Sequence, residues 1–332
     1  NEQWATARRG EELVRQALVA QHCYIRGQQY EIVDGRVVIV DEYTGRFLPD
    51  RSWEHGLHQS VEAKEDLEVT ADRETLARLS FQRFFRSYKF LCGMTGTAAD
   101  SAGEMERVYG RPVTVIPTNK PVIREQEPTR YFRGADAKWA AIVERIRSEH
   151  DSGRPVLVGT RSVEASQLLS ERLEVLGLEH SVLNAHHHEE EAQLIAQAGH
   201  VGAITVATNM AGRGTDIKLT PESRRLGGLF VVLTEIHGAR RVDRQFIGRA
   251  GRQGDPGGAQ IFASLEDELV TKYAPNLGEV VASRANYDEL SGSRIAERVF
   301  KMAQSRSEAR DRRGRTQVMR QDDWVDRYMP SV

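Results

Sequence analysis

One segment carries the clearest signal of the fold: Ala203-Ile-Thr-Val-Ala-Thr-Asn-Met-Ala-Gly-Arg-Gly-Thr-Asp216. It begins as a short apolar run, typical of a buried strand, and continues into a glycine-flanked arginine and then an aspartate. In open parallel α/β sheets, ligands bind beyond the carboxyl ends of the strands, where residues 209–216 are expected to lie. The segment therefore predicts a strand that leads into a nucleotide-facing loop, although a Gly-rich turn with one surface arginine gives the same pattern.

A second segment has the same character: Gln245-Phe-Ile-Gly-Arg-Ala-Gly-Arg-Gln-Gly-Asp-Pro-Gly257. It places Arg249 and Arg252 three residues apart in a run broken by glycines. Glycine lets the backbone adopt positive φ and approach a ligand closely, and arginine presents a planar, charged fork that suits phosphate oxygens. Two such segments after consecutive strands predict guanidinium groups that face a phosphate.

Predicted strands alternate with predicted helices around these segments. We expect strands at 155–159, 181–184, 203–207, 229–233 and 260–264, and helices at 137–149, 163–176, 189–197 and 239–247. This rhythm is typical of a mostly parallel sheet with right-handed crossovers. The fold class is therefore α/β, with a parallel sheet flanked by helices.

A small mixed α+β unit is predicted before this domain. A helix over residues 2–20 is expected to pack through the apolar positions of one face, which are Trp4, Leu13, Val14, Ala17 and Leu18. Residues 30–40 then form a hairpin, because Asp34-Gly35 supplies the positive φ that a tight primed turn needs. The unit ends before a second, longer helix.

That second helix is predicted over Arg73–Leu91, with a row of aromatic residues that favours core packing over a stacking surface for nucleic acid. Residues 113–128 are rich in proline and predict an extended connection. Beyond the sheet, the charged tail from Asn286 to Val332 keeps Ile295, Val299 and Met302 at helical spacing. We therefore expect a long amphipathic helix there.

Composition limits the function classes. The chain has 332 residues, enough for two or three units, and a net charge of −2, so its basic character is confined to one cluster of arginines, Arg240, Arg241, Arg244, Arg249 and Arg252. The two cysteines, Cys23 and Cys92, have no paired spacing and suit a reducing compartment. The sequence starts at Asn1 without a methionine, and we expect a segment of a longer protein.

Three other chemistries are disfavoured. The apolar strand that ends in Asp41-Glu42 resembles a Walker B motif, but the sequence contains no Gly-x-x-x-x-Gly-Lys-Ser/Thr loop to hold the phosphates. His186-His187-His188 cannot all face one metal ion, so a solvated helix start fits this run better. Ser166 and Ser170 have no nearby acid and base partners for nucleophilic catalysis.

Several segments together resemble the SecA preprotein translocase ATPase family, and they occur along this chain in the same order as in that family. They are Val40–Arg46, Gly56–Glu65, Gly93–Ala98, Pro117–Pro121, Val156–Thr160, Ser162–Ser166, Leu183–Ala185, Ile195–Gly199, Thr205–Ile217 and Gln245–Gly257. The upstream segments favour SecA over nucleic-acid helicases of the same superfamily, whose second halves also carry arginine- and glycine-rich runs. The resemblance implies a second RecA-like, helicase-type motor domain.

The resemblance also implies a division of the chain. Residues 1–65 would be the end of a preprotein cross-linking domain with its linking strands, and 66–118 the end of the first motor domain. Residues 119–270 would be the second motor domain, and 271–332 the start of a helical scaffold. The magnesium ligands of such a motor would lie in its first half, outside this chain.

The site residues implied by the resemblance belong to an ATP site shared between two motor domains. Arg252, Arg249 and Arg213 would stabilise charge on the transferred phosphoryl group as arginine fingers. Cofactor contacts to ATP would come from Asp216, Gly212, Gly214 and Arg252. A loop of Thr95, Gly96 and Thr97, which on its own would be a helix-capping turn, would couple nucleotide state to domain movement.

The implied partners are the Sec channel, preproteins and the missing first motor half, with no specific nucleic acid, and a homodimer is compatible with the resemblance. The implied location is the cytoplasm, peripherally on the inner face of the bacterial plasma membrane. Two alternatives stay open: half of a nucleic-acid helicase, and a motor-derived binding module without ATPase activity. The chain alone, without a phosphate loop, is expected not to hydrolyse ATP.

Overall fold

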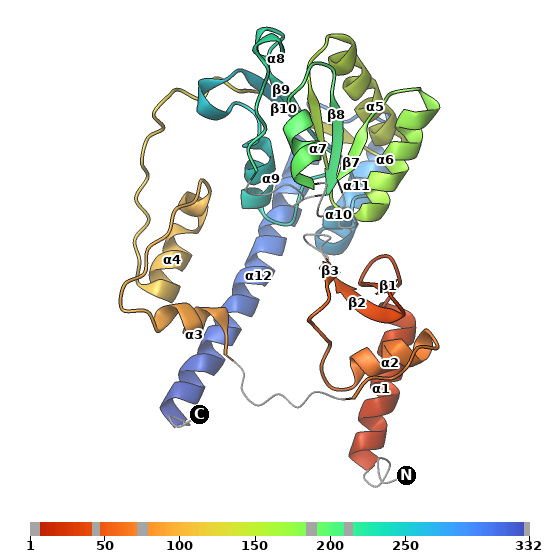
Figure 1. The fold of residues 1–332 in the computed structure, drawn as a ribbon, viewed down its shortest axis with the longest axis vertical. Coiled ribbons are helices and arrows are strands. Elements are labelled where there is room, and N and C mark those ends of the chain that lie inside the picture. Colours follow the sequence, from red (N-terminus) through yellow and green to blue (C-terminus); the bar gives the residue numbers. More distant parts are fainter. Residues whose placement is uncertain (1–6, 42–46, 72–78, 184–190, 209–214, 329–332) are drawn as a thin grey trace.

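The computed structural model describes residues 7–41, 47–71, 79–183, 191–208 and 215–328 (Figure 1). An N-terminal unit, α1 to α2, precedes a helical segment, α3 to α4, and a larger domain built around a parallel sheet. One long helix, α12 (Arg294–Tyr328), runs from the larger domain toward α3 (Figure 1).

The large domain is organised by a seven-stranded sheet whose strands all pair in parallel. The order is β4-β10-β9-β6-β8-β7, and β5 also pairs with β10. In β6, β8, β9 and β10 every residue is buried, as expected for parallel strands that are covered on both faces. The bounds are β4 Glu125–Gln126, β5 Arg130–Phe132, β6 Val156–Thr160, β7 Ser181–Leu183, β8 Ile204–Thr208, β9 Leu229–Leu233 and β10 Gly257–Ser264.

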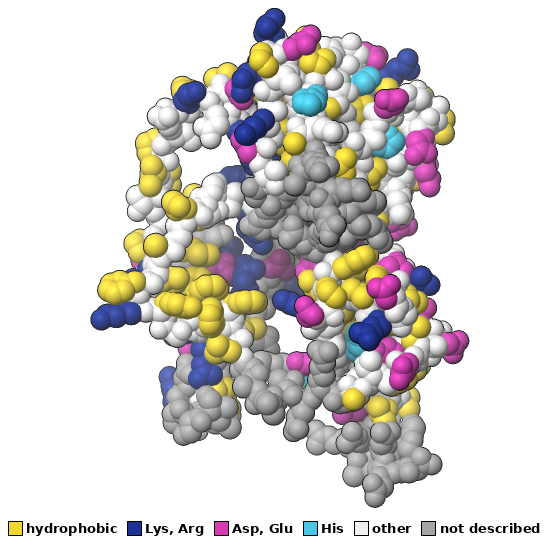
Figure 2. All heavy atoms as spheres, viewed as in Figure 1, with side chains coloured by type: hydrophobic (Ala, Val, Ile, Leu, Met, Phe, Trp, Pro, Cys, Tyr) yellow, Lys and Arg dark blue, Asp and Glu magenta, His cyan; other side chains and the backbone are white. Residues whose placement is uncertain are grey.

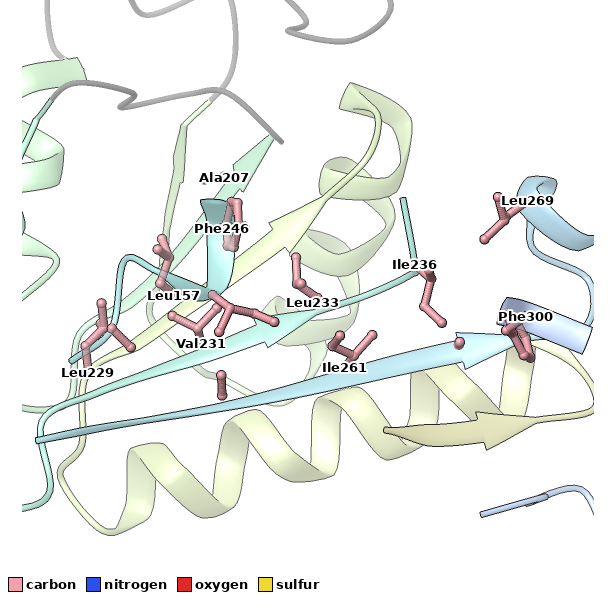
Figure 3. Packing of buried hydrophobic residues seen from close by; sticks show 14 of the residues in the cluster. Leu157, Ala207, Leu229, Val231, Leu233, Ile236, Phe246, Ile261, Leu269 and Phe300 are labelled. Atoms are coloured by element: carbon pink, nitrogen blue, oxygen red, sulfur yellow. The ribbon is translucent and has the colours of Figure 1, made fainter. Parts of the chain in front are cut away.

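Helices cover both faces of this sheet. On one face, α5 (Ala135–Asp151) and α6 (Val163–Val175) pack against β6 residues Val156 and Val158. On the other face, Leu157 packs in a cluster with residues of α7 (Glu191–Gln197), α9 (Arg240–Ile247), α10 (Glu268–Tyr273) and α12 (Figure 3). The α/β class and the elements predicted around the two arginine segments are confirmed, with ends shifted by a few residues.

Close packing between β6 and α9 requires a glycine in the strand. A Cβ atom at Gly159 would lie 2.6 Å from Phe246 Cε1 and 2.9 Å from Leu233 Cδ2. The Phe246 ring is fully buried and lies over the sheet beside Ala207 (Figure 3). This contact seats α9 directly on the sheet and so fixes where the segment after α9 begins.

The N-terminal unit confirms the predicted hairpin. Strand β1 (Tyr30–Val33) pairs antiparallel with β2 (Arg36–Val40), and Asp34 and Gly35 have φ of 51° and 72°. The predicted face of the first helix is partly wrong, because Val14 and Leu18 are more than half exposed, and Trp4 lies outside the described residues. Helix α1 instead packs on α2 through the side that holds Leu13 and Ala20. The remaining bounds are α1 Ala7–Cys23, β3 Phe47–Leu48 and α2 Leu57–Lys64.

The predicted long helix before residue 91 is also wrong in its described part. Ser80 is extended, with ψ of 154°, and its side chain accepts a hydrogen bond from the Arg83 amide, so α3 begins at Phe81 and ends at Arg86. Phe81 and Phe90 are 72% and 85% exposed instead of packed in a core. Hydrophobic side chains gather over this region in Figure 2. Next come η2 (Ala98–Ser101) and α4 (Ala102–Tyr109), and then the predicted extended connection, which has no helix or strand before β4.

The charged tail forms the predicted long helix, α12 (Arg294–Tyr328), after α11 (Pro275–Arg284). Its buried face differs from the prediction, because Ile295 and Met302 are exposed and only Val299 is buried. The helix instead buries Ala296, Phe300, Ala303, Gln304 and Ser307. Small and hydrogen-bonding side chains let α12 approach the domain closely. A sequence pattern of large apolar residues does not reveal a buried face of this kind. None of the described helices is long and apolar enough to cross a membrane.

Candidate nucleotide-facing site

The segment that we call the arginine loop (residues 248–257) connects α9 to β10. Its backbone is left-handed at Gly251, Gln253 and Gly254, with φ of 66°, 56° and 78°. A Cβ atom at Gly251 would lie 2.6 Å from Arg124 Cβ, so glycine is required there for space as well as for conformation. The glycines thus let the extended connection pack against the loop.

Arg252 is the exposed arginine of this loop. Its Nη1 atom lies 2.9 Å from Asp216 Oδ1, and its Nε atom donates to the Gly248 carbonyl oxygen at 3.2 Å. The Arg252 side chain is 41% exposed and that of Asp216 is 49% exposed. The guanidinium group is therefore oriented by two hydrogen bonds while it stays accessible to a ligand.

Arg249 lies differently. It is only 8% exposed, and its guanidinium carbon lies 5.5 Å from the centre of the Phe246 ring. A cation over an aromatic face is attracted by the ring's electrostatic field. The two arginines that the sequence places three residues apart are thus one buried side chain and one exposed side chain.

The structure corrects the expected position of the site on the sheet. A Cβ atom at Gly257, the first residue of β10, would lie 2.7 Å from the Gly251 amide nitrogen. Arg252, and the Asp216 carboxylate paired with it, therefore lie near the amino end of β10 and not beyond the carboxyl ends of the strands. The chain leaves β8 at its carboxyl end, but it has turned back by Lys218, whose carbonyl lies against Gly199 before β8.

Three of the predicted site residues, Gly212, Arg213 and Gly214, lie outside the described residues, as do His186–His188. The described structure therefore brings together Arg252 and Asp216 from the predicted set, whereas Arg249 is buried over Phe246.

The predicted coupling loop is an exposed turn. Thr95 Oγ1 accepts a hydrogen bond from the Thr97 amide at 3.3 Å and lies 3.3 Å from Thr97 Oγ1. Thr97 precedes η2, but its side chain does not cap it. The segment is linked to α9 one turn later, where Asp100 Oδ2 lies 2.7 Å from Arg244 Nη1.

Two contacts of the arginine loop were missed from the sequence. Arg124 Nη1 donates to the Ala250 carbonyl oxygen at 3.0 Å, and burial lowers the pKa of this guanidinium. Arg224 Nε lies 2.9 Å from Asp255 Oδ1. Arg124 belongs to the proline-rich connection, which has no periodicity, so the sequence carries no signal that would place it at the loop.

A separate cavity of about 480 Å³ lies at the carboxyl ends of β6, β9 and β10. Arg161 lines it, with Nη2 2.6 Å from Glu268 Oε2 and Nη1 3.6 Å from Glu235 Oε2. Behind it, Lys138 Nζ lies 2.5 Å from Asp267 Oδ1, and both side chains are buried. Carboxylates outnumber the cationic side chains in the lining of the cavity, so it offers no excess positive charge to a phosphate.

Comparisons with known proteins agree with the motifs. The family model for the SecA P-loop domain matches residues 121–225 and 220–289, and the model for the SecA preprotein cross-linking domain matches residues 4–62. The matched residues do not contain a Gly-x-x-x-x-Gly-Lys-Ser/Thr loop.

Curated relatives extend the match to nearly the whole chain. Protein translocase subunit SecA 2 of Nitrosospira multiformis is 48% identical over 96% of this chain and 48% of its own length. Protein translocase subunit SecA of Nitratiruptor sp. is 46% identical over 96% of this chain and 37% of its own. The chain thus spans about half or less of the length of these relatives.

Among solved structures, the yeast DEAD-box splicing factor Prp28 is similar at 18% identity and a TM-score of 0.40, covering 63% of this chain and 44% of its own. Two family models and close relatives over nearly the whole chain agree on one assignment: this chain belongs to the SecA family.

Proposed function

We propose that this chain supplies the arginine side of an ATP site in a SecA-type motor that moves preproteins through the Sec channel. The observation that carries the proposal is Arg252, which is oriented by Asp216 and the Gly248 carbonyl yet 41% exposed. A preorganised guanidinium that can reach a phosphate stabilises the negative charge that develops during phosphoryl transfer.

The neighbouring residues take different roles. Arg249 stabilises the arginine loop, because its side chain is buried over Phe246. It can reach the nucleotide only after a conformational change of the loop that exposes this side chain. Asp216 holds Arg252 and can accept a hydrogen bond from a sugar hydroxyl, since a carboxylate repels phosphate. Gly212, Arg213 and Gly214 are assigned to the nucleotide from the family pattern, and Thr95, Gly96 and Thr97 to coupling.

The rest of the ATP site is assigned to a first motor half. Because the sequence contains no Gly-x-x-x-x-Gly-Lys-Ser/Thr loop, we place the phosphate loop, and the Mg²⁺ ligands with it, in that half. We expect the chain alone to release no phosphate from ATP. Magnesium-dependent turnover of this polypeptide that Arg252→Ala abolishes would overturn that expectation.

The main test uses the full-length motor. Arg252→Ala is expected to lower kcat for ATP hydrolysis by about a thousandfold, the usual size of an arginine-finger effect. Arg252→Lys should restore little, because an ammonium group does not reproduce the planar fork. Arg225→Ala, at an exposed arginine of α8 (Pro221–Arg225), is the matched control. Full activity of Arg252→Ala would exclude the proposal.

We place the motor in the cytoplasm, peripherally on the inner face of the membrane, with the Sec channel and preproteins as partners and a homodimer as its assembly. A competition experiment separates this function from that of a helicase. Unfolded secretory polypeptide should displace a labelled preprotein from the full-length protein, whereas single-stranded nucleic acid should not. Salt-dependent binding of single strands with preference over polypeptide would favour the helicase.

A further inference from the structure

Helix α12 is hydrogen-bonded to the start of α9 through a buried network of polar side chains. Asp243, in the first turn of α9, accepts hydrogen bonds at Oδ1 from the His237 amide (3.0 Å) and His237 Nδ1 (2.7 Å). Its other oxygen, Oδ2, accepts one at 2.8 Å from Gln304 Nε2 of α12, which also donates to the His237 carbonyl oxygen at 2.9 Å. His237, Asp243 and Gln304 are all at least 93% buried, since their exposed fractions are 5%, 7% and 7%.

The chemistry of the network allows one arrangement. An ionised carboxylate only accepts hydrogen bonds, so the ring nitrogen Nδ1 of His237 must carry the proton that faces Asp243. Both partners of the Gln304 amide are oxygens, which fixes its nitrogen toward them. A buried polar group left without its partner is costly, so the network specifies one position of α12 relative to α9.

Further contacts reinforce the same junction. Glu308 Oε1 accepts from the Arg240 amide at 2.9 Å and so caps α9, whose own N-cap residue, Ala239, offers no side-chain cap. Ser305 Oγ accepts from Arg240 Nη2 at 3.0 Å. A Cβ atom at Gly238 would lie 2.8 Å from Ser307 Oγ, which shows how closely α12 approaches the chain before α9.

Helix α9 connects this junction to the arginine loop. It has eight residues, so its two ends are about 12 Å apart, and Gly248 follows it directly. The buried Phe246 seats its last turn on the sheet over Gly159. Because α12 holds the first turn and Phe246 seats the last turn, a tilt of α12 turns α9 about the Phe246 contact and so changes the direction in which the following residues leave the helix.

We propose that Gln304 and Asp243 are positioning residues, through which α12 sets the placement of α9 and hence of Arg252 in the ATP site. This rests on the proposed function of Arg252. Helix α12 has 35 residues and a length of about 50 Å, so its far end reaches well beyond the junction. A partner that shifts that end changes the angle at which α12 holds α9.

The test is a double-mutant cycle in the full-length motor, with steady-state ATP hydrolysis at varied ATP concentration as the readout. Gln304→Leu removes both of its hydrogen bonds and keeps a side chain of similar size. We expect about a tenfold lower kcat, while KM for ATP changes by less than about twofold, because misplacement of Arg252 weakens only the transition state. Gln317→Leu, the same change at an exposed position of α12, is the control and should leave kcat unchanged.

The same substitution is then made in an Arg252→Ala background. If Gln304 acts through Arg252, Gln304→Leu has no further effect there. An equal fall in both backgrounds would show a merely structural role and overturn the proposal. The proposal would also be overturned if Gln304→Leu left kcat unchanged while Arg252→Ala abolished ATP hydrolysis. Full activity of Arg252→Ala would instead overturn the proposed function, and the positioning role with it.

A second variant keeps the test valid if Gln304→Leu does not fold. Glu308→Ala removes only the cap of α9 from a partly exposed residue, and its fold can be checked by thermal unfolding. It is expected to lower kcat by about threefold, and this effect should also vanish in the Arg252→Ala background. Persistence of the effect in that background would count against the positioning role.

Discussion

Arg252 and Asp216 lie 2.9 Å apart between Nη1 and Oδ1, although 36 residues separate them in the sequence. Both side chains are more than a third exposed, and ion pairs of this kind contribute only about 0–1 kcal/mol to stability. The role of the pair is therefore to orient the Arg252 guanidinium, which Asp216 holds in one direction at the surface before a ligand binds.

Asp216→Asn tests that role. Because the pair is exposed, we expect the free energy of unfolding to change by less than about 1 kcal/mol, while kcat for ATP hydrolysis by the full-length motor falls by about tenfold. Asp255→Asn breaks a second ion pair of the arginine loop, Arg224–Asp255, and is the matched control. Equal kinetic effects of the two substitutions would show that only general loop stability matters.

Gly159→Ala tests the seat of α9 on the sheet. The added methyl group would lie 2.6 Å from the Phe246 ring, so we expect a loss of about 1–3 kcal/mol in the free energy of unfolding, measured with urea. Gly314→Ala, in α12, is the control, because no atom outside the local backbone of its own helix lies within 4 Å of the position of its added methyl group. That control should gain up to about 1 kcal/mol from helix propensity. A neutral Gly159→Ala would contradict the packing described here.

The Glu104–Arg315 pair predicts a pH dependence. The hydrogen bond from Arg315 lowers the pKa of Glu104 below its ordinary value. A carboxyl group with a depressed pKa in the folded state stabilises the fold above its unfolded pKa, about 4.3, and this contribution is lost as the pH falls through the folded pKa. Since Arg315 is partly exposed, we expect about 0.5 kcal/mol between wild type and Glu104→Gln at pH 7.

That difference should shrink toward zero as the pH is lowered from 5 to 3. Glu106→Gln, at an exposed carboxylate of α4, is the control for the general effect of removing an acidic residue. A difference between wild type and Glu104→Gln that is constant with pH would mean that Glu104 is not held ionised by Arg315.

The sheet could be predicted because its inner strands are buried on both faces. Val156–Thr160 and Leu229–Leu233 are continuous apolar or small-residue runs, and the helices between them carry clear periodicity. The edge strands β4 and β5 have only two and three residues, and both depend on pairing with β10. Nothing local in the sequence marks them.

The sequence predicted which types of residue form the candidate site. It did not predict how these residues are arranged in space. Glycines around Arg252 predicted a close-approach loop, and the loop is left-handed at Gly251 and Gly254. The burial of Arg249 and the position of Asp216 near the amino end of β10 follow from the path of the chain after β8 and from the seating of Phe246. These are tertiary contacts, which periodicity does not encode. The same reason explains the wrong faces predicted for α1 and α12.

The extended connection before β4 ends on the arginine loop. A Cβ atom at Gly254 would lie 2.9 Å from Lys120 Cδ, and one at Gly251 would lie 2.6 Å from Arg124 Cβ. Both contacts precede β4 along the chain, so a pulling force transmitted through the connection reaches the arginine loop before it reaches any strand of the sheet. A shift of the connection would therefore displace the backbone at Gly251 and Gly254 before it moves a strand.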